Sequence, residues 1–96
     1  MKILIVEDEP KVASFIKEGL EENGFEVDIA YDGISAEKMA AEDRYGFFIV
    51  DVIMPGINGI ELCRKLKQMN PVVPVIILTA LGTTDDKLSG FEAGAN

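Results

Sequence analysis

The 96-residue sequence contains no histidine, no tryptophan and a single cysteine. Without histidine the chain cannot build a Ser-His or Cys-His nucleophile, and it lacks a principal ligand of zinc sites. One cysteine cannot form an internal disulfide, which excludes a disulfide-stabilised scaffold and favours a reducing compartment. These absences exclude the commonest nucleophilic hydrolases and most zinc proteins.

Basic residues are scarce as well. Nine Lys and Arg stand against 17 Asp and Glu, so the formal net charge is −8. Nucleic acids and anionic membranes are bound by clustered Lys and Arg, so we expect this chain to bind neither directly. The apolar start, residues 1–6, meets Glu7-Asp8-Glu9 at once and is too short for a signal peptide or a membrane span. The sequence therefore predicts a small, soluble, acidic domain in the cytoplasm.

Four short segments have the patterns of β-strands. Residues 3–6, 47–50 and 75–78 are continuous apolar runs, which are typical of parallel strands covered on both faces. Residues 25–30 alternate apolar with charged side chains, as a strand at the edge of a sheet does. We therefore expect three inner strands and one edge strand.

Helical periods separate these strands. The first is expected to begin at Asp8 or Glu9 with Pro10 and to stop at Asn23-Gly24. The second begins at Asp32-Gly33, the third covers about 58–69, and the fourth starts near Thr84. The inward side chains are expected to be Val12, Phe15, Ile16, Leu20, Ala36, Met39, Ala40, Ile60, Cys63, Leu66, Met69, Leu88 and Phe91. Four β-α units in series predict one α/β domain over residues 1–96, with helices on both sides of a parallel sheet.

Polar side chains follow three of the predicted strands. Glu7 and Asp8 follow the first, Asp51 the third and Thr79 the fourth. Ligands of open parallel sheets bind outside the carboxyl ends of the strands, so neighbouring strands would bring these groups into one crevice. Gathered carboxylates repel one another unless a cation joins them, and an all-oxygen set suits Mg²⁺. Water on Mg²⁺ exchanges for phosphoryl oxygens, which favours phosphoryl transfer with Asp51 as ligand, nucleophile or both.

Each of these residues also has an ordinary structural interpretation. Glu7 and Asp8 suit the positive end of a helix, Asp51 could be a loop acid, and Thr79 a structural hydroxyl. Their equivalent places at strand ends favour a shared site. No Gly-rich turn follows the first strand, which excludes a P-loop and a dinucleotide fingerprint. Cys63, on the apolar stripe of the third helix, is expected to be a core residue.

Three segments make the sequence resemble the receiver domain of bacterial two-component response regulators. They are Leu4-Ile5-Val6-Glu7-Asp8-Glu9-Pro10, residues 50–62 with the pattern Asp-x-x-Met-Pro-Gly-x-x-Gly, and Ile77-Leu78-Thr79-Ala80. The resemblance covers the whole chain in order and spacing. It implies a flavodoxin-like (CheY-like) doubly wound sheet of strand order 2-1-3-4. The opening also resembles the regulators that carry a C-terminal winged-helix DNA-binding domain.

The resemblance assigns a role to each residue of the crevice. Asp8 matches a magnesium ligand, Glu7 its acidic partner, and the backbone carbonyl of Ile53 completes the coordination together with Asp51. Asp51 matches the acceptor that takes a phosphoryl group from a phosphohistidine on a sensor histidine kinase. Such a domain catalyses only its own phosphorylation and dephosphorylation, so we do not expect an enzyme in the usual sense.

The implied switch lies at the end of the fourth strand. Thr79 matches the hydroxyl that moves to the phosphoryl group, and the small Ala80 leaves access beside it. The signal would pass to an output beyond this chain, and we expect that output to regulate transcription by binding DNA.

The end of the sequence departs from the family. Receiver domains have five β-α units, whereas this sequence stops after four, without the fifth-strand lysine that pairs with phosphoryl oxygens; Lys87 does not replace it. We expect an incomplete, truncated receiver that self-associates through its uncovered sheet face or edge, as a dimer or by exchange of elements. Two hypotheses follow. One is a phospho-accepting switch, and the other is a receiver-derived fragment that assembles without signalling.

Overall fold

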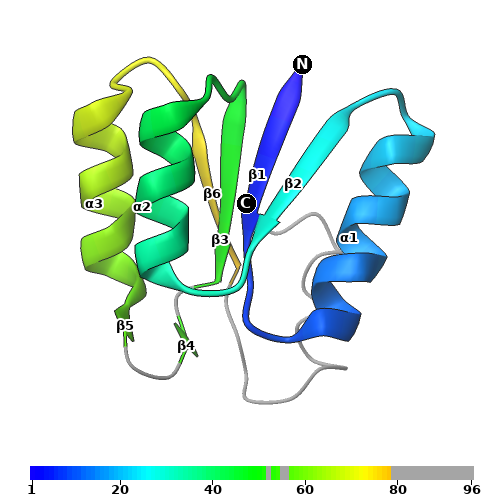
Figure 1. The fold of residues 1–96 in the computed structure, drawn as a ribbon, viewed down its shortest axis with the longest axis horizontal. Helices are drawn as coiled ribbons and strands as arrows, with labels where there is room; N and C mark the ends of the chain where they lie inside the picture. Colours follow the sequence, from blue (N-terminus) through cyan, green and yellow to red (C-terminus); the bar gives the residue numbers. More distant parts are fainter. Residues whose placement is uncertain (52, 55–56, 79–96) are drawn as a thin grey trace.

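A computed structural model describes residues 1–51, 53–54 and 57–78. Figure 1 shows helices packed around an open sheet, and a small hairpin below it. The elements in chain order are β1 (Lys2–Val6), α1 (Pro10–Glu22), β2 (Glu26–Ala30), α2 (Gly33–Glu42), β3 (Phe47–Asp51), β4 (Ile53–Met54), β5 (Ile57–Asn58), α3 (Gly59–Met69) and β6 (Val75–Leu78). The fourth helix predicted from near Thr84 falls outside the described residues.

The main sheet is parallel and has the order β2-β1-β3-β6. This confirms the predicted order 2-1-3-4, because β6 is the fourth strand of that sheet. Ile5 of β1 lies between Ile29 of β2 and Ile49 of β3. The chain moves outward from β1 to β2 and then back across to β3, so the order reverses between β1 and β3. Such a reversal opens a crevice at the carboxyl ends of these two strands.

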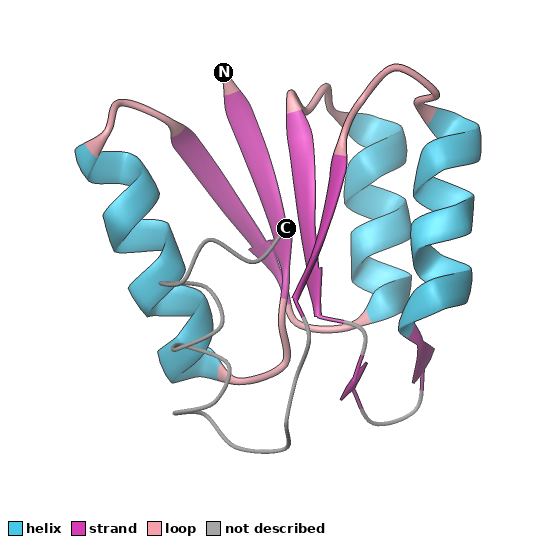
Figure 2. Ribbon diagram, turned by 180° about the vertical axis from the view of Figure 1, so that it is seen from behind, coloured by secondary structure: helices cyan, strands magenta, loops and turns pink. Residues whose placement is uncertain are grey.

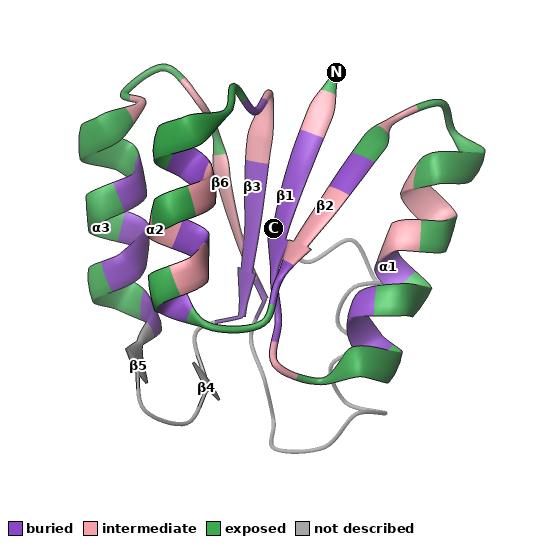
Figure 3. Cartoon of the chain, in the orientation of Figure 1, coloured by how far each residue is buried: buried purple, intermediate pink, exposed green. Residues whose placement is uncertain are grey.

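Helices cover both faces of the sheet, and each face has its own apolar cluster. Figures 1 and 2 show α1 on one side, with α2 and α3 together on the other. Ile3 and Ile5 of β1 pack with Val12 and Ile16 of α1, whereas Leu4 packs in the cluster of α2 and α3. Successive side chains of a strand point to opposite faces, so a run that is apolar throughout supplies both clusters. Figure 3 shows the burial along β1 and β3 that results.

The helix ends follow the predicted signals. Asp32 precedes α2 and its side chain accepts a hydrogen bond from the Ser35 N–H at 2.7 Å, as a helix N-cap does. That bond also lowers the pKa of the Asp32 carboxyl below its usual value. After α1, Gly24 adopts a φ of +89°, a left-handed conformation that only glycine adopts without strain. The predicted start and stop of α1 and the predicted start of α2 are therefore confirmed.

The buried face of α3 differs from the predicted stripe. Cys63 and Leu66 are buried as expected, but Ile60 is 56% exposed and Met69 40% exposed. Leu62, which the stripe omitted, is buried. A repeat of three residues drifts around a helix that has 3.6 residues per turn. The two ends of the predicted stripe therefore rotate away from the core.

The edge strand β2 carries one charged side chain that is held by a polar network. The Tyr45 hydroxyl donates to Asp28 Oδ2 at 2.7 Å, and Lys2 Nζ lies 3.4 Å from the same carboxylate and 2.5 Å from Asp43 Oδ2. Burial, followed by the bond to Asp28, raises the pKa of the Tyr45 hydroxyl well above its usual range. A charge pointing inward from an edge strand discourages pairing with another chain. The network lets β2 carry that charge without leaving it unsatisfied.

Removing the hydroxyl of this network should destabilise the fold. Tyr45 is 7% exposed and Asp28 is partly exposed, so we expect Tyr45→Phe to lower the free energy of unfolding by about 1 kcal/mol. Urea unfolding followed by circular dichroism measures this difference. Tyr31→Phe is the matched control, because Tyr31 is 49% exposed and should show almost no change. Equal effects of the two substitutions would show that the bond to Asp28 contributes nothing.

The described helices are short. In residues 1–51, 53–54 and 57–78, no helix has the length and apolar character needed to cross a membrane.

Candidate functional site

Three carboxylates meet at the carboxyl edge of the sheet. Glu7 and Asp8 directly follow β1, and Asp51 is the last residue of β3. The two strands are neighbours, with Val6 paired to Val50. One ligand oxygen from each of the three acids lies within 4.8 Å of the others. The structure thus brings together the three acidic residues that the sequence placed in one crevice.

Two of these acids are deeply buried. Glu7 and Asp51 are both 0% exposed, and no other charged residue in the described part of the chain is buried. Asp8 is partly exposed, unlike the other two acids. Burying a carboxylate costs free energy unless other groups compensate its charge, and three close carboxylates add mutual repulsion. An arrangement of this kind is typical of a site that holds a cation.

The turn between β1 and α1 positions the first two acids. The Glu7 N–H donates to Ala30 O at 3.0 Å, which ties the end of β1 to the end of β2. The Glu7 side chain then accepts a hydrogen bond from the Glu9 N–H, with Oε2 at 2.9 Å. Glu9 is the N-cap residue of α1, and its own side chain makes no capping hydrogen bond. The helix-end interpretation of Glu7 therefore holds beside the functional one, and the sequence did not reveal this bond.

The donor set fits a hard divalent cation. All three groups offer carboxylate oxygens, which Mg²⁺ and Ca²⁺ prefer, and the sequence has no histidine that would favour zinc. Cys63 is no candidate ligand, because it lies buried on α3 and burial raises the pKa of its thiol. This agrees with the prediction that Cys63 is a core residue.

Of the remaining predicted site residues, the structure describes Ile53 but not Thr79 or Ala80. Ile53 begins the two-stranded antiparallel hairpin of β4 and β5, two residues after Asp51, and it pairs with Asn58. The sequence did not predict this hairpin, which leads directly into α3. Thr79 and Ala80 lie outside the described residues, so their predicted roles stay predictions.

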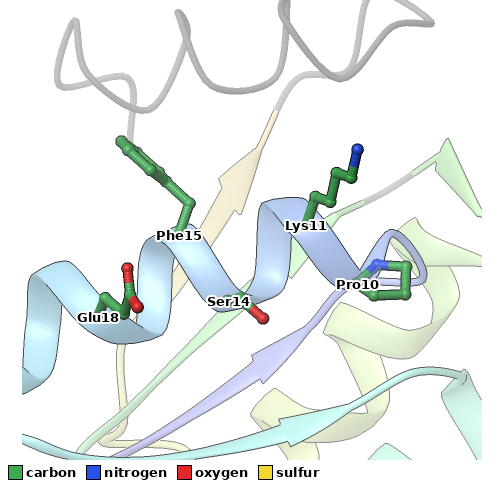
Figure 4. A pocket seen from close by; sticks show the side chains of 5 residues that line it. All are labelled: Pro10, Lys11, Ser14, Phe15 and Glu18. Carbon is green, nitrogen blue, oxygen red and sulfur yellow. The ribbon is translucent and has the colours of Figure 1, made fainter.

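A shallow hollow lies on α1, separate from the acids. Figure 4 shows Lys11 and Phe15 projecting from the same side of the helix. The described residues that line the hollow are Pro10, Lys11, Ser14, Phe15 and Glu18. Phe15 was expected to point inward, yet it is 41% exposed. The buried face of α1 is centred on Val12 and Ile16, one turn of the helix apart, and Phe15 stands beside that face. The first helix therefore presents an aromatic and a cationic side chain together.

Comparison with known proteins agrees with this geometry. The family described as the response regulator receiver domain matches residues 3–96. Response regulator ArlR of Staphylococcus saprophyticus is 44% identical over 95 residues, which are 99% of this chain and 43% of that protein. Transcriptional regulatory protein CusR of Escherichia coli is 41% identical over 96 residues, which are 100% of this chain and 42% of that protein. The chain thus spans less than half the length of these relatives.

Solved structures share the fold. The receiver domain of the Francisella response regulator 1452 has a TM-score of 0.76 and 38% identity, over 99% of this chain and 78% of that one. Response regulator TrrA of Thermotoga maritima has a TM-score of 0.79 and 36% identity, over 94% of this chain and 78% of that one. With the sheet order and the acidic cluster, these matches settle the family: the chain belongs to the receiver domains of two-component response regulators.

Proposed function

We propose that Asp51 accepts a phosphoryl group from a phosphohistidine of a sensor histidine kinase, and that the modified domain acts as a signalling switch. One observation supports this most directly: Asp51 is fully buried at the end of β3, with its carboxylate beside those of Glu7 and Asp8. Burying a carboxylate costs free energy unless another group compensates its charge, which favours a functional reason for an acid at this place. Receiver domains as a family work with sensor histidine kinases.

The acidic cluster is proposed to hold Mg²⁺. Asp8 and Asp51 would bind through carboxylate oxygens, Ile53 through its backbone carbonyl, and Glu7 as their acidic partner. When bound, the ion offsets the repulsion between Asp51 and the incoming phosphoryl oxygens. TrrA of Thermotoga maritima, which has the same fold, has been solved in complex with Mg²⁺ and BeF. The proposal carries that metal preference over to this chain.

The proposed reaction is a transfer between two side chains. An Asp51 carboxylate oxygen forms a bond to phosphorus while the bond from phosphorus to the histidine nitrogen breaks. That nitrogen keeps the bonding electron pair, and the imidazole leaves neutral because its other ring nitrogen carries a proton. The product is an acyl phosphate on Asp51. Thr79 is proposed to donate a hydrogen bond to the new phosphoryl oxygens, and Ala80 to leave room beside them. Movement of that hydroxyl would bias a two-state surface.

The wider role follows from the proposed switch. The hollow that Lys11 and Phe15 line on α1 is our candidate contact for the kinase. We propose a cytoplasmic location, and a DNA-binding output that regulates transcription. The relative CusR is a transcriptional regulatory protein of which this chain matches 42%. We propose no turnover of free substrate, since the chain would modify and reset only itself.

Incubation with Mg²⁺ and a small acyl phosphate tests the proposal. Intact-mass measurement should detect one phosphoryl adduct on the wild-type chain. Asp51→Ala should form no adduct, because it lacks the proposed acceptor carboxylate at the end of β3. Asp32→Asn is the matched control. It removes an exposed carboxylate at the same edge of the sheet and should keep the adduct. A wild-type chain that forms no adduct at any dose would favour the alternative of an assembly module without signalling.

Self-association is proposed as a property of this chain as well. Among the strands that the structure describes, β6 pairs with β3 only, and β6 carries no charged residue that would discourage further pairing. Light scattering over a range of concentrations should therefore show a dimer or a larger species. A well-folded monomer at high concentration would contradict this prediction, and it would leave the phosphoryl-acceptor proposal unaffected.

A further inference from the structure

Glu7 is held by main-chain groups at both its N–H and its carboxylate. Its N–H donates to Ala30 O at 3.0 Å, and its Oε2 accepts from the Glu9 N–H at 2.9 Å. Both ends of the residue are therefore tied to main-chain groups. A side chain with 0% exposure that is held at both ends has very little freedom to move.

The bond to Glu9 is made at the start of α1. Glu9 is the N-cap residue, and its carbonyl accepts the N–H of Ala13 at 3.0 Å, which is the first hydrogen bond of the helix. Pro10, the first helical residue, has no N–H of its own to contribute. In the described structure, the Glu7 carboxylate is thus the side chain that links the end of β1 to the N-cap of α1.

Asp8 lies inside the loop that this bond closes. The ring runs from the Glu7 side chain through the Glu9 N–H and back along the main chain across Asp8. Closing it restricts the backbone angles of Asp8, and hence the direction from which its carboxylate approaches Asp51. A hydrogen bond to an ionised acceptor is about twice as strong as a neutral one, which suits this purpose.

We propose that Glu7 is a positioning residue: its carboxylate holds the turn of residues 7–9 through the Glu9 N–H, so that Asp8 is placed beside Asp51 before the cation arrives. The inference rests on the proposed function, because it assumes a cation at this cluster. It assigns different tasks to the two acids after β1. Asp8 binds the ion, and Glu7 keeps Asp8 and the start of α1 in place.

Two substitutions separate positioning from charge. Glu7→Gln keeps an oxygen acceptor for the Glu9 N–H but removes the negative charge, whereas Glu7→Ala removes both. Glu22→Gln is the control for net charge, since Glu22 is exposed and ends α1, whereas the cluster lies at the start of that helix. Two quantities are measured in the full chain by amide NMR. They are the hydrogen-exchange rate of the Glu9 amide without metal, and the Mg²⁺ dissociation constant from chemical shifts.

We expect Glu7→Ala to speed exchange of the Glu9 amide by about 10-fold or more, and Glu7→Gln to leave it within a few-fold of wild type. We expect Glu7→Ala to weaken Mg²⁺ binding by about 10- to 100-fold, clearly more than Glu7→Gln, because outer groups that orient ligands have effects of this size. Glu22→Gln should change neither quantity.

Two results would overturn the inference. One is an unchanged exchange rate of the Glu9 amide in Glu7→Ala. The other is an equal loss of Mg²⁺ affinity in Glu7→Ala and Glu7→Gln, which would show that only the negative charge of Glu7 contributes to binding. Failure of the proposed function is recognised separately, because the wild-type chain would then bind no Mg²⁺ at all. The exchange measurement on metal-free protein still decides whether Glu7 holds the turn.

Discussion

Mg²⁺ is expected to raise the thermal unfolding midpoint of the wild-type chain, and Asp8→Asn is expected to abolish that rise. The three carboxylates of Glu7, Asp8 and Asp51 lie within 4.8 Å, so a bound divalent cation relieves repulsion that exists only in the folded chain. A ligand that binds only the folded state stabilises it by about 2.7 kcal/mol at 100 times its dissociation constant. For a domain of this size that corresponds to roughly 10–20 °C.

The same repulsion predicts how the variant behaves without metal. Asp8→Asn removes one of three like charges, so its midpoint in metal-free buffer should equal or exceed that of the wild type. Differential scanning calorimetry in Mg²⁺ and in NaCl of equal ionic strength measures both effects. Asp32→Asn is the control, because it loses a charge outside the cluster, keeps a capping side chain, and should retain the full rise. A rise of equal size in Asp8→Asn would place the cation elsewhere.

The second large effect is expected in the core. Phe48 of β3 is 1% exposed, and its ring centroid lies 5.8 Å from that of Tyr45. Phe48 lies between two strands, because it pairs with Leu4 of β1 and with Val75 of β6. Truncation leaves a cavity that the two strands cannot close. We therefore expect Phe48→Ala to cost about 3–5 kcal/mol of unfolding free energy.

A loss of that size is a large part of what a small domain has, since typical stabilities are about 5–15 kcal/mol. Urea unfolding should show a much lower midpoint with an unchanged slope, which separates lost stability from a changed unfolded state. Ile34→Ala, at a side chain that is 80% exposed, should stay within about 0.5 kcal/mol of wild type. Similar midpoints for both variants would mean that the α2 and α3 cluster is not the main core.

The strands could be predicted from the sequence because their burial leaves a direct mark on it. Residues 3–6 and 47–50 are apolar at every position, and both segments lie inside the sheet with a helix layer on each face. Residues 26–30 alternate because β2 is an edge strand. The strand order 2-1-3-4, with its reversal between the first and third strands, was implied by the family resemblance.

The helix faces were harder to predict. On α3, Ile60 and Leu62 are both apolar, and only packing against α2 and β3 decides which one is buried. A choice of three-residue spacing selected Ile60, whereas the structure buries Leu62. On α1, the spacing of three residues from Val12 predicts an inward Phe15, yet Val12 and Ile16 fill the space against β1. The tertiary contacts that settle these choices are not encoded in local periodicity.

The candidate site was predictable in composition and less so in detail. Glu7, Asp8 and Asp51 could be placed together because each follows a strand. The hydrogen bond from the Glu9 N–H to Glu7 could not be predicted, because it depends on the backbone angles of a three-residue turn. Helix-end and cation-site interpretations of Glu7 were treated as alternatives. The structure shows that the Glu7 carboxylate accepts a hydrogen bond at the start of α1 and also lies in the acidic cluster.

Mapping the modified residue decides whether Asp51 is the phosphoryl acceptor. Borohydride reduces an acyl phosphate of aspartate to homoserine, so treatment after reaction with a small acyl phosphate marks the acceptor permanently. Peptide mass spectrometry should then find homoserine at position 51 in the presence of Mg²⁺, and none when a chelator is added before the acyl phosphate. Homoserine at position 8 or at another acid, or none at position 51, would contradict the account.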